Sequence, residues 1–280
     1  MFRTSNPALR NDAYSQSWDD LGGQVSYGNE RAAAAGGPKI MTMQGTVNKS
    51  ALLISFCAAS ALFAWNLSLD QAEGAVAMTG WTFPLLLGGL LGGFLTMLIA
   101  SFKPQASVVL GPICAICEGG FVGALSAVYA VQFAADSDML NTGLIFNAAL
   151  LTFGIFGGLL AAYSTKMLRP NKTFYNVVIT ASMGVGLYAL VAIGASFFGA
   201  PSLASVFDPS NGGLLSIGFS VVLVLLASAN LVLDFDLINN GVKNRAPKYM
   251  EWYSGMALLV TLVWLYVEVL RLLAKLQSRD

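Results

Sequence analysis

Seven long apolar segments, separated by short polar loops, follow one another along the sequence after residue 50. We place them at residues 51–69, 81–102, 107–131, 140–162, 174–198, 213–238 and 253–273. Each approaches the length of about 20 apolar residues that an α-helix needs to cross a bilayer. Their Gly, Ala and Leu content, without alternating polarity, favours helices over the strands of a membrane barrel. The pattern predicts an all-α, polytopic membrane protein with seven transmembrane helices.

The first 45 residues have a different composition, rich in Gly, Ala, Ser, Asn and charged residues, and they show no sustained periodicity. We therefore expect a flexible cytoplasmic tail at residues 1–45 and a seven-helix transmembrane domain at residues 46–280. The first apolar segment begins near Ala51, which is too far along the chain for an ordinary cleavable signal peptide. We expect it to remain as a membrane anchor.

Charge alternates from loop to loop, and this alternation predicts the orientation in the membrane. Basic residues collect in the tail and in every second loop: Arg3, Arg10, Arg31, Lys39, Lys49, Lys103, Lys166, Arg169, Lys172, Lys243, Arg245 and Lys248. The intervening loops hold acidic residues and no basic ones: Asp70, Glu73, Asp136, Asp138 and Asp208. Because short cytoplasmic loops accumulate Lys and Arg, the N-terminus and the basic loops are expected in the cytoplasm.

The C-terminus departs from this alternation, because it carries Arg271, Lys275 and Arg279. These residues would be exported if the seventh segment spans the membrane, and cytoplasmic if that segment re-enters. The sequence leaves both topologies open.

Composition excludes several classes of function. Hydrophobic residues make up 56% of the chain, charged residues only 11%, and the 15 basic residues balance the 15 acidic ones, so nothing indicates a nucleic-acid partner. The sequence contains no histidine, which excludes Ser-His-Asp hydrolysis, H-E-x-x-H metalloproteases and imidazole proton relays. Cys114 and Cys117 form a C-x-x-C inside an apolar segment, without a second pair, and this indicates buried packing. We expect neither enzymatic activity nor a resident cofactor.

Four carboxylates inside the predicted helices are the candidate functional residues: Glu118, Asp234, Asp236 and Glu268. A charged side chain near the bilayer centre costs at least ~2.5–3.5 kcal/mol, so an acid there indicates function by default. Glu118 has no basic neighbour in its own helix and must be protonated, paired across helices or solvated.

The other three acids also have structural interpretations. Asp234 and Asp236 lie near the end of the sixth segment, where they could reach interfacial water or face Lys243 and Arg245. Glu268 precedes Arg271 by three residues, so the two share a helix face and could neutralise one another. A fifth acid, Glu251, adjoins interfacial aromatic residues and is expected to have a structural role.

Glycines spaced four apart occur in three segments, as in the pairs Gly89–Gly93, Gly119–Gly123 and Gly154–Gly158. Such faces let helix backbones approach closely. We expect packing within the molecule, with a seam between two copies as the alternative.

The motifs together resemble the transmembrane Bax inhibitor motif family, also called Bax inhibitor-1-like, in its bacterial branch. The resemblance rests on EGG-x-x-G-x-x-S beginning at Glu118, on the Phe235-Asp236 pair that closes the sixth segment, and on LYVEVLRLL around Glu268. It covers residues from about 50 to 275 and leaves out the N-terminal tail.

This resemblance implies a fold in which the last helix is wrapped by the other six, and a calcium leak governed by pH. The family's proton-sensing pair of aspartates corresponds to Asp236, with Asp234 as a rival, and to Glu268, where Glu replaces the usual Asp. A proton shared by such a pair would hold the path closed. At higher pH the doubly ionised pair would repel and offer the oxygen ligands that calcium prefers, making Asp236 and Glu268 the candidate calcium ligands.

A depth estimate tests this pairing. If the seventh segment rises straight from residue 253, Glu268 lies about 22 Å from its start, whereas Asp236 lies about 3 Å inside the sixth segment. Glu118, about 17 Å from residue 107, would then be the closer acid to Glu268. Whether Glu268 meets Asp236 or Glu118 stays open.

The leading hypothesis is a pH-regulated cation leak, with calcium as the expected ion, in a bacterial inner membrane and gated by protonation of embedded carboxylates. The alternative is a membrane scaffold or regulator of a membrane protease or other assembly, without conductance. An intramembrane aspartyl protease would need a Gly-x-Gly-Asp stretch, which the sequence lacks. A secondary transporter would be favoured by symmetry between halves, and we see none.

Overall fold

The computed structural model describes residues 40–72, 75–134, 140–168, 170–197 and 205–279. Its helices are α2 (Met43–Ser68), α3 (Thr82–Phe102), α4 (Ser107–Gln132), α5 (Thr142–Ser164), α6 (Lys172–Phe197), α7 (Leu214–Lys243) and α8 (Met250–Gln277). All seven are long and apolar enough to cross a membrane. The predicted all-α fold with seven transmembrane helices is confirmed.

The helices extend beyond the apolar segments that predicted them. α2 begins eight residues before Ala51, where the Thr42 side chain caps it by accepting a hydrogen bond from the Gly45 amide at 3.0 Å. α7 continues past residue 238 to Lys243. Hydropathy detects only the part of a helix that lies in hydrocarbon, so polar turns at the ends escape it.

A small β-hairpin joins α2 to α3, in a region that hydropathy marks only as a loop. It pairs β1 (Leu69–Ala72) with β2 (Ala75–Met78) in antiparallel register, with Leu69 opposite Met78. The Thr79 amide donates to the Ser68 carbonyl at 3.0 Å, so the hairpin closes directly on the end of α2.

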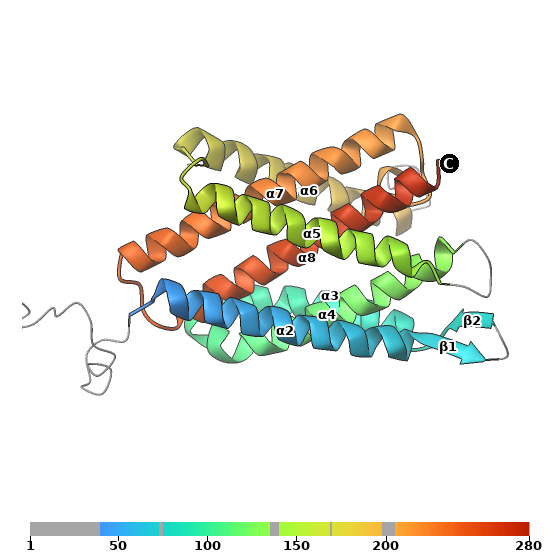
Figure 1. Cartoon of the computed structure of the whole chain (residues 1–280), viewed down its shortest axis with the longest axis horizontal. Coiled ribbons are helices and arrows are strands. Elements are labelled where there is room, and N and C mark those ends of the chain that lie inside the picture. Colours follow the sequence, from blue (N-terminus) through green and yellow to red (C-terminus); the bar gives the residue numbers. More distant parts are fainter. Residues whose placement is uncertain (1–39, 73–74, 135–139, 169, 198–204, 280) are drawn as a thin grey trace, which may run out of the picture. The chain divides into compact units, whose positions relative to one another are not determined.

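α8 lies at the centre of the bundle (Figure 1). Within the described helices it packs against α2, α4, α5 and α7, and more lightly against α3, whereas α6 packs mainly on α7. Leu265 and Leu270 join one apolar core with α5 and α7, and Met256 and Leu259 join a second with α2 and α4. The last helix is therefore central, as expected, but α6 stands in a second layer.

The seventh segment spans the bundle, because α8 is one continuous helix of 28 residues. It starts just after residues 244–249, which connect it to α7. It ends beside the connection between α4 and α5, where the Asn141 side chain donates to Gln277 at 2.9 Å. The re-entrant alternative does not hold, so Arg271 and Lys275 lie toward the end opposite the α7–α8 connection.

The two ends of the bundle can be named by their connections. We call basic end the one with the α3–α4, α5–α6 and α7–α8 connections, and acidic end the one with the hairpin and the α4–α5 and α6–α7 connections. Several charges behind the sidedness prediction lie outside the described residues: Arg3, Arg10, Arg31, Lys39, Glu73, Asp136, Asp138 and Arg169.

The chain enters the helical domain at the basic end. Ile40 forms a β-bridge with Pro247, and the Met41 amide donates to the Ala246 carbonyl at 2.7 Å. Residues 40–45 of the predicted tail thus belong to the helical domain, which begins at residue 40 rather than 46. Residues 1–39 lie outside the described part of the chain.

The glycine faces of α3 and α4 serve packing within the molecule. A Cβ atom on Gly93 would lie closer than 3.0 Å to the Glu118 side chain, and one on Gly119 would meet the Cys57 carbonyl of α2 equally closely. The intramolecular interpretation is correct there. On α5, by contrast, a Cβ atom on Gly154 or Gly158 would meet no atom of the described residues within 4 Å.

Candidate functional site

Asp236 is the centre of a polar cluster that joins three helices. Its Oδ1 accepts a hydrogen bond from the Tyr163 hydroxyl of α5 at 2.9 Å. Its Oδ2 accepts from the Tyr175 hydroxyl of α6 at 2.6 Å and from the Asn240 amide of α7 at 2.8 Å. Three neutral donors therefore satisfy this carboxylate, and it does not face Lys243 or Arg245 in an ion pair within the described residues.

A cavity of about 880 Å³ opens beside this cluster, between α2, α5 and α7. Asp236, Tyr163 and Asn239 supply polar groups to its wall, and Leu258 of α8 belongs to its lining. Lys166 and Lys243, at the ends of α5 and α7, line it at the basic end. Asp236 thus borders a space that reaches from the basic end toward the central helix.

Asp234 faces a different neighbour. Two residues along a helix turn the side-chain direction by about 200°, so Asp234 points away from the Asp236 cluster. The Thr261 hydroxyl of α8 lies beside the Asp234 carboxyl group, and Oδ2 is buried without a hydrogen-bond partner among the described residues. Asp234 therefore belongs to the α7–α8 contact, and Asp236 to the cavity.

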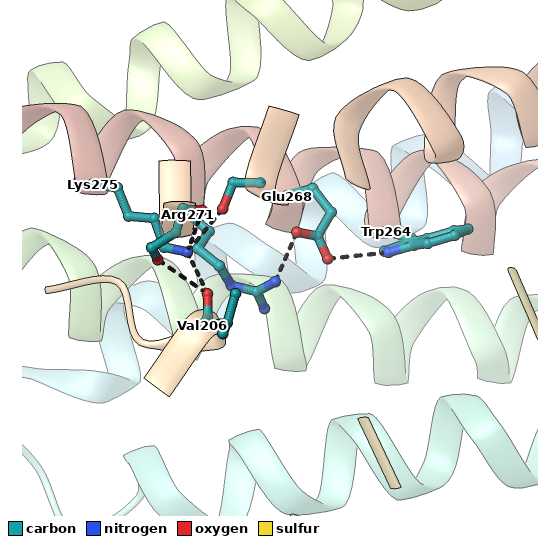
Figure 2. A network of polar contacts seen from close by, with 7 residues as sticks. Val206, Trp264, Glu268, Arg271 and Lys275 are labelled. Carbon is teal, nitrogen blue, oxygen red and sulfur yellow. Dashed lines mark hydrogen bonds and ion pairs between the residues drawn. The ribbon is translucent and has the colours of Figure 1, made fainter. Parts of the chain in front are cut away.

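Glu268 forms an ion pair on the central helix (Figure 2). Its Oε2 lies 2.7 Å from Nη1 of Arg271, and its Oε1 accepts from the Trp264 indole at 3.2 Å. Only 4% of Glu268 is exposed. The three-residue spacing allowed Arg271 to neutralise Glu268, and the structure shows this ion pair. The Arg271 guanidinium also lies 5.4 Å from the centre of the Phe207 ring.

Lys275 is a buried cation that sequence reasoning did not single out. It is fully buried, and its ammonium donates to the Val206 carbonyl at 2.5 Å, to the Ser216 carbonyl at 3.2 Å and to the Ser220 hydroxyl at 2.9 Å (Figure 2). These acceptors are all neutral. They attach the acidic end of α8 to the start of α7 and to the connection before it.

Glu118 lies in an apolar contact between α2, α3 and α4. It is 9% exposed, and its carboxyl group packs against Gly93. No hydrogen bond or ion pair to it occurs within the described part of the chain. An unpaired carboxylate is costly in such surroundings, so the protonated form is favoured. Cys57 and Cys114 lie nearby as buried free thiols. For Cys114 this agrees with the buried packing that we expected for the C-x-x-C.

The four predicted acids do not come together. No hydrogen bond in the described part of the chain joins any two of them, and no group of three His, Cys, Asp or Glu side chains there could hold a metal ion. Asp236 lies about 10 Å along α7 from its basic end, and Glu268 about 27 Å along α8. The shared Asp236–Glu268 site implied by the resemblance is therefore not formed, for the reason that the depth estimate gave, and Glu118 forms no hydrogen bond with Glu268 either.

Glu251 has the structural role expected of it, but it is fully buried rather than interfacial. Its Oε1 accepts from the amide and the hydroxyl of Thr42, both at 2.9 Å, and lies 2.8 Å from the Lys248 ammonium. A Cβ atom on Gly45 would lie closer than 3.0 Å to the Glu251 carboxyl group, so a side chain there would displace this carboxylate. This carboxylate fastens the start of α2 to the start of α8.

A sequence model of the family described as Bax inhibitor 1 like matches residues 6–278. The chain belongs to that family. The match includes most of the N-terminal residues, so the expectation that the resemblance begins near residue 50 is wrong. Comparisons of this Bax inhibitor 1 like protein with curated proteins and with solved structures give no significant match.

Proposed function

We propose that this Bax inhibitor 1 like protein is a pH-regulated cation leak, with calcium as the expected ion, gated by protonation of membrane-embedded carboxylates. The observation that carries the proposal is Asp236, held by donors from three helices at the wall of a large cavity. Intramembrane acids beside a cavity are typical of ion and proton pathways.

The Asp236 cluster supplies the first gating element. As an anion, Asp236 accepts three hydrogen bonds and holds α5, α6 and α7 together. A proton on the carboxyl group removes its charge and one of its acceptor positions, which weakens this attachment. Its oxygens are also hard ligands of the kind that calcium prefers.

Glu268 and Arg271 supply the second gating element, on the central helix. Their ion pair requires ionised Glu268, so protonation leaves a partly buried guanidinium without its counter-charge. The hydrogen bonds to Asp236 and the Glu268–Arg271 ion pair are therefore intact at higher pH and weaken as the pH falls. This predicts greater flux in acid, opposite to the sign implied by a proton shared between Asp236 and Glu268.

The proposed location is a plasma membrane, with the N-terminus and the basic end in the cytoplasm. Lys103, Lys166 and Lys243 lie at the basic end, and Asp70 and Asp208 at the acidic end, as the positive-inside rule requires. Arg271 and Lys275 do not contradict this orientation, because one is paired and the other is buried among hydrogen-bond acceptors. Arg279, exposed just after α8, is the one of the three that departs from it.

The test is calcium entry into liposomes that contain a calcium-sensitive dye, measured from mildly acidic to mildly alkaline pH. Wild type should show flux that rises in acid, and Asp236→Asn and Glu268→Gln should each flatten this dependence. Asp70→Asn, an exposed acid in the hairpin, serves as the matched control and should follow wild type.

Absence of flux at every pH, or pH dependence unchanged in both variants, would contradict the proposal. Absence of flux would favour the alternative function, a scaffold or regulator of a membrane protease or other assembly. The open surface at Gly154 and Gly158 is the observation that supports this alternative, because small residues let a partner helix approach.

A further inference from the structure

Two cavities lie along the space between α2 and α5. The cavity of about 880 Å³ occupies the basic end, and a second, of about 520 Å³, continues toward the acidic end. Both are lined by Ile54 of α2, and α8 contributes Leu258 to the first and Leu262 to the second. Figure 1 shows α8 crossing behind α5 on its way to the C-terminus. We call the two cavities together the α2–α5 groove.

The acidic half of the groove is apolar. Its lining includes Leu62, Trp65, Phe146 and Phe153. Three of its few polar side chains are engaged within the protein: the Thr152 hydroxyl donates to the Ala148 carbonyl at 2.7 Å, and the Ser126 and Tyr266 hydroxyls share a hydrogen bond of 2.8 Å. This half therefore suits a hydrocarbon occupant.

The basic half has a cationic mouth. Lys166 and Lys243 are exposed, line the cavity and form no ion pair within the described residues. The carboxylate in the same lining, Asp236, is already satisfied by its three neutral donors. Lys166 also has a φ of 62°, a left-handed backbone conformation that glycine usually adopts at the end of a helix. Lys166 and Lys243 therefore line the cavity at its basic end without a counter-ion among the described residues.

We propose that the α2–α5 groove binds an anionic phospholipid, with its phosphate between Lys166 and Lys243 and its acyl chains along α8. Cationic groups at one end and hydrocarbon walls at the other match the two parts of such a lipid. A zwitterionic lipid would bring its own ammonium group to the lysines, and a soluble phosphate would leave the apolar half empty. Basic residues close to the membrane surface attract anionic lipids, and basic pockets between transmembrane helices bind their head groups.

The site does not depend on the leak proposed above, because it requires neither a titrating acid nor a conducted ion. Bound lipid would place hydrocarbon over the part of α8 that α2 and α5 leave uncovered. It would also place negative charge beside the cavity that leads to Asp236.

Native mass spectrometry of the full-length protein, released from detergent with added phosphatidylglycerol or phosphatidylcholine, tests the proposal. We expect tight retention of phosphatidylglycerol only. The double variant Lys166→Gln, Lys243→Gln should weaken that retention by about tenfold or more, since each lysine near an anionic head group contributes about a fivefold effect. The matched double variant Lys103→Gln, Lys172→Gln removes equal charge outside the groove lining and should retain lipid like wild type.

A second pair of variants tests the apolar half independently of charge. Ala51→Trp fills the groove and should lower lipid retention, whereas Leu52→Trp, on a neighbouring residue outside the lining, should not. Soluble glycerol phosphate should fail to displace the lipid. The proposal is overturned by equal retention of phosphatidylcholine, by equal losses in a variant and its matched control, or by displacement with glycerol phosphate. Because the measurement involves no ion flux, its outcome tests lipid binding independently of the proposed leak.

Discussion

The two ends of the α7–α8 hairpin each hold a charged side chain among neutral partners, but the charges have opposite sign. Near the basic end, Asp236 accepts from two tyrosines and an asparagine. At the acidic end, Lys275 donates to two backbone carbonyls and a serine. In both places the direct contacts are hydrogen bonds with neutral groups, and neither side chain forms an ion pair within the described residues.

The partners differ in how easily they can change. The donors to Asp236 are side chains from three helices, and Tyr163 lines the same cavity as Asp236, so water or a cation in the cavity could replace that donor. Two of the acceptors for Lys275 are main-chain carbonyls, and their positions are set by the path of the backbone. We infer that Lys275 is a fixed anchor and that Asp236 is the adjustable element. Between them, Glu268 and Arg271 neutralise each other directly.

The largest effect is expected from breaking this direct pair. Arg271→Met leaves Glu268 buried without its counter-charge and should destabilise the protein by about 3–5 kcal/mol, as measured by unfolding in detergent. The double variant Glu268→Gln, Arg271→Met removes both charges and should recover most of this loss. A double variant as unstable as the single one would show that packing of Arg271 on Phe207, rather than charge, dominates.

A smaller effect is expected at the fixed anchor. Lys275→Met leaves buried acceptors unsatisfied and should cost about 1–3 kcal/mol. Hydrogen exchange should rise selectively at residues 205–220, which Lys275 attaches to α8. Arg279→Met, on an exposed residue one turn further, should change neither quantity. Uniform loosening of the whole bundle would contradict the local role of Lys275.

The sequence predicted those features that depend on composition or on neighbours in one helix. The number of membrane helices follows from apolar length, and the Glu268–Arg271 pair follows from a three-residue spacing that brings side chains onto one face. The central place of α8 came from the family resemblance, and the structure confirms it. Helix rise gave a reason against an Asp236–Glu268 contact, but the sequence alone left that contact open.

Contacts between distant segments were not predictable in the same way. Tyr163 and Tyr175 lie near helix ends, where aromatic residues are common at a membrane interface for reasons unrelated to any carboxylate. The acceptors for Lys275 include main-chain carbonyls, which every residue has, so the sequence does not reveal them. Its one sequence signal is a lysine in the last turn of a long apolar helix. The Asp236 cluster depends on how α5, α6 and α7 pack, and the Lys275 cluster on how α8 packs against the start of α7. Hydropathy determines neither arrangement.

The smallest effect is expected at the adjustable element, where single donors can be removed without leaving a charge unpaired. Tyr175→Phe deletes one of the three hydrogen bonds to Asp236 and should cost about 1 kcal/mol. Tyr163→Phe is the matched variant, and it also removes the acceptor of the Asn239 amide. Because these donors bond to an ionised acceptor, Tyr175→Phe should cost less in an Asp236→Asn background, where the acceptor is a neutral amide. An equal cost in both backgrounds would show that the hydroxyl does not act through the carboxylate, and the distinction between the adjustable and the fixed ends would have to be drawn without Asp236.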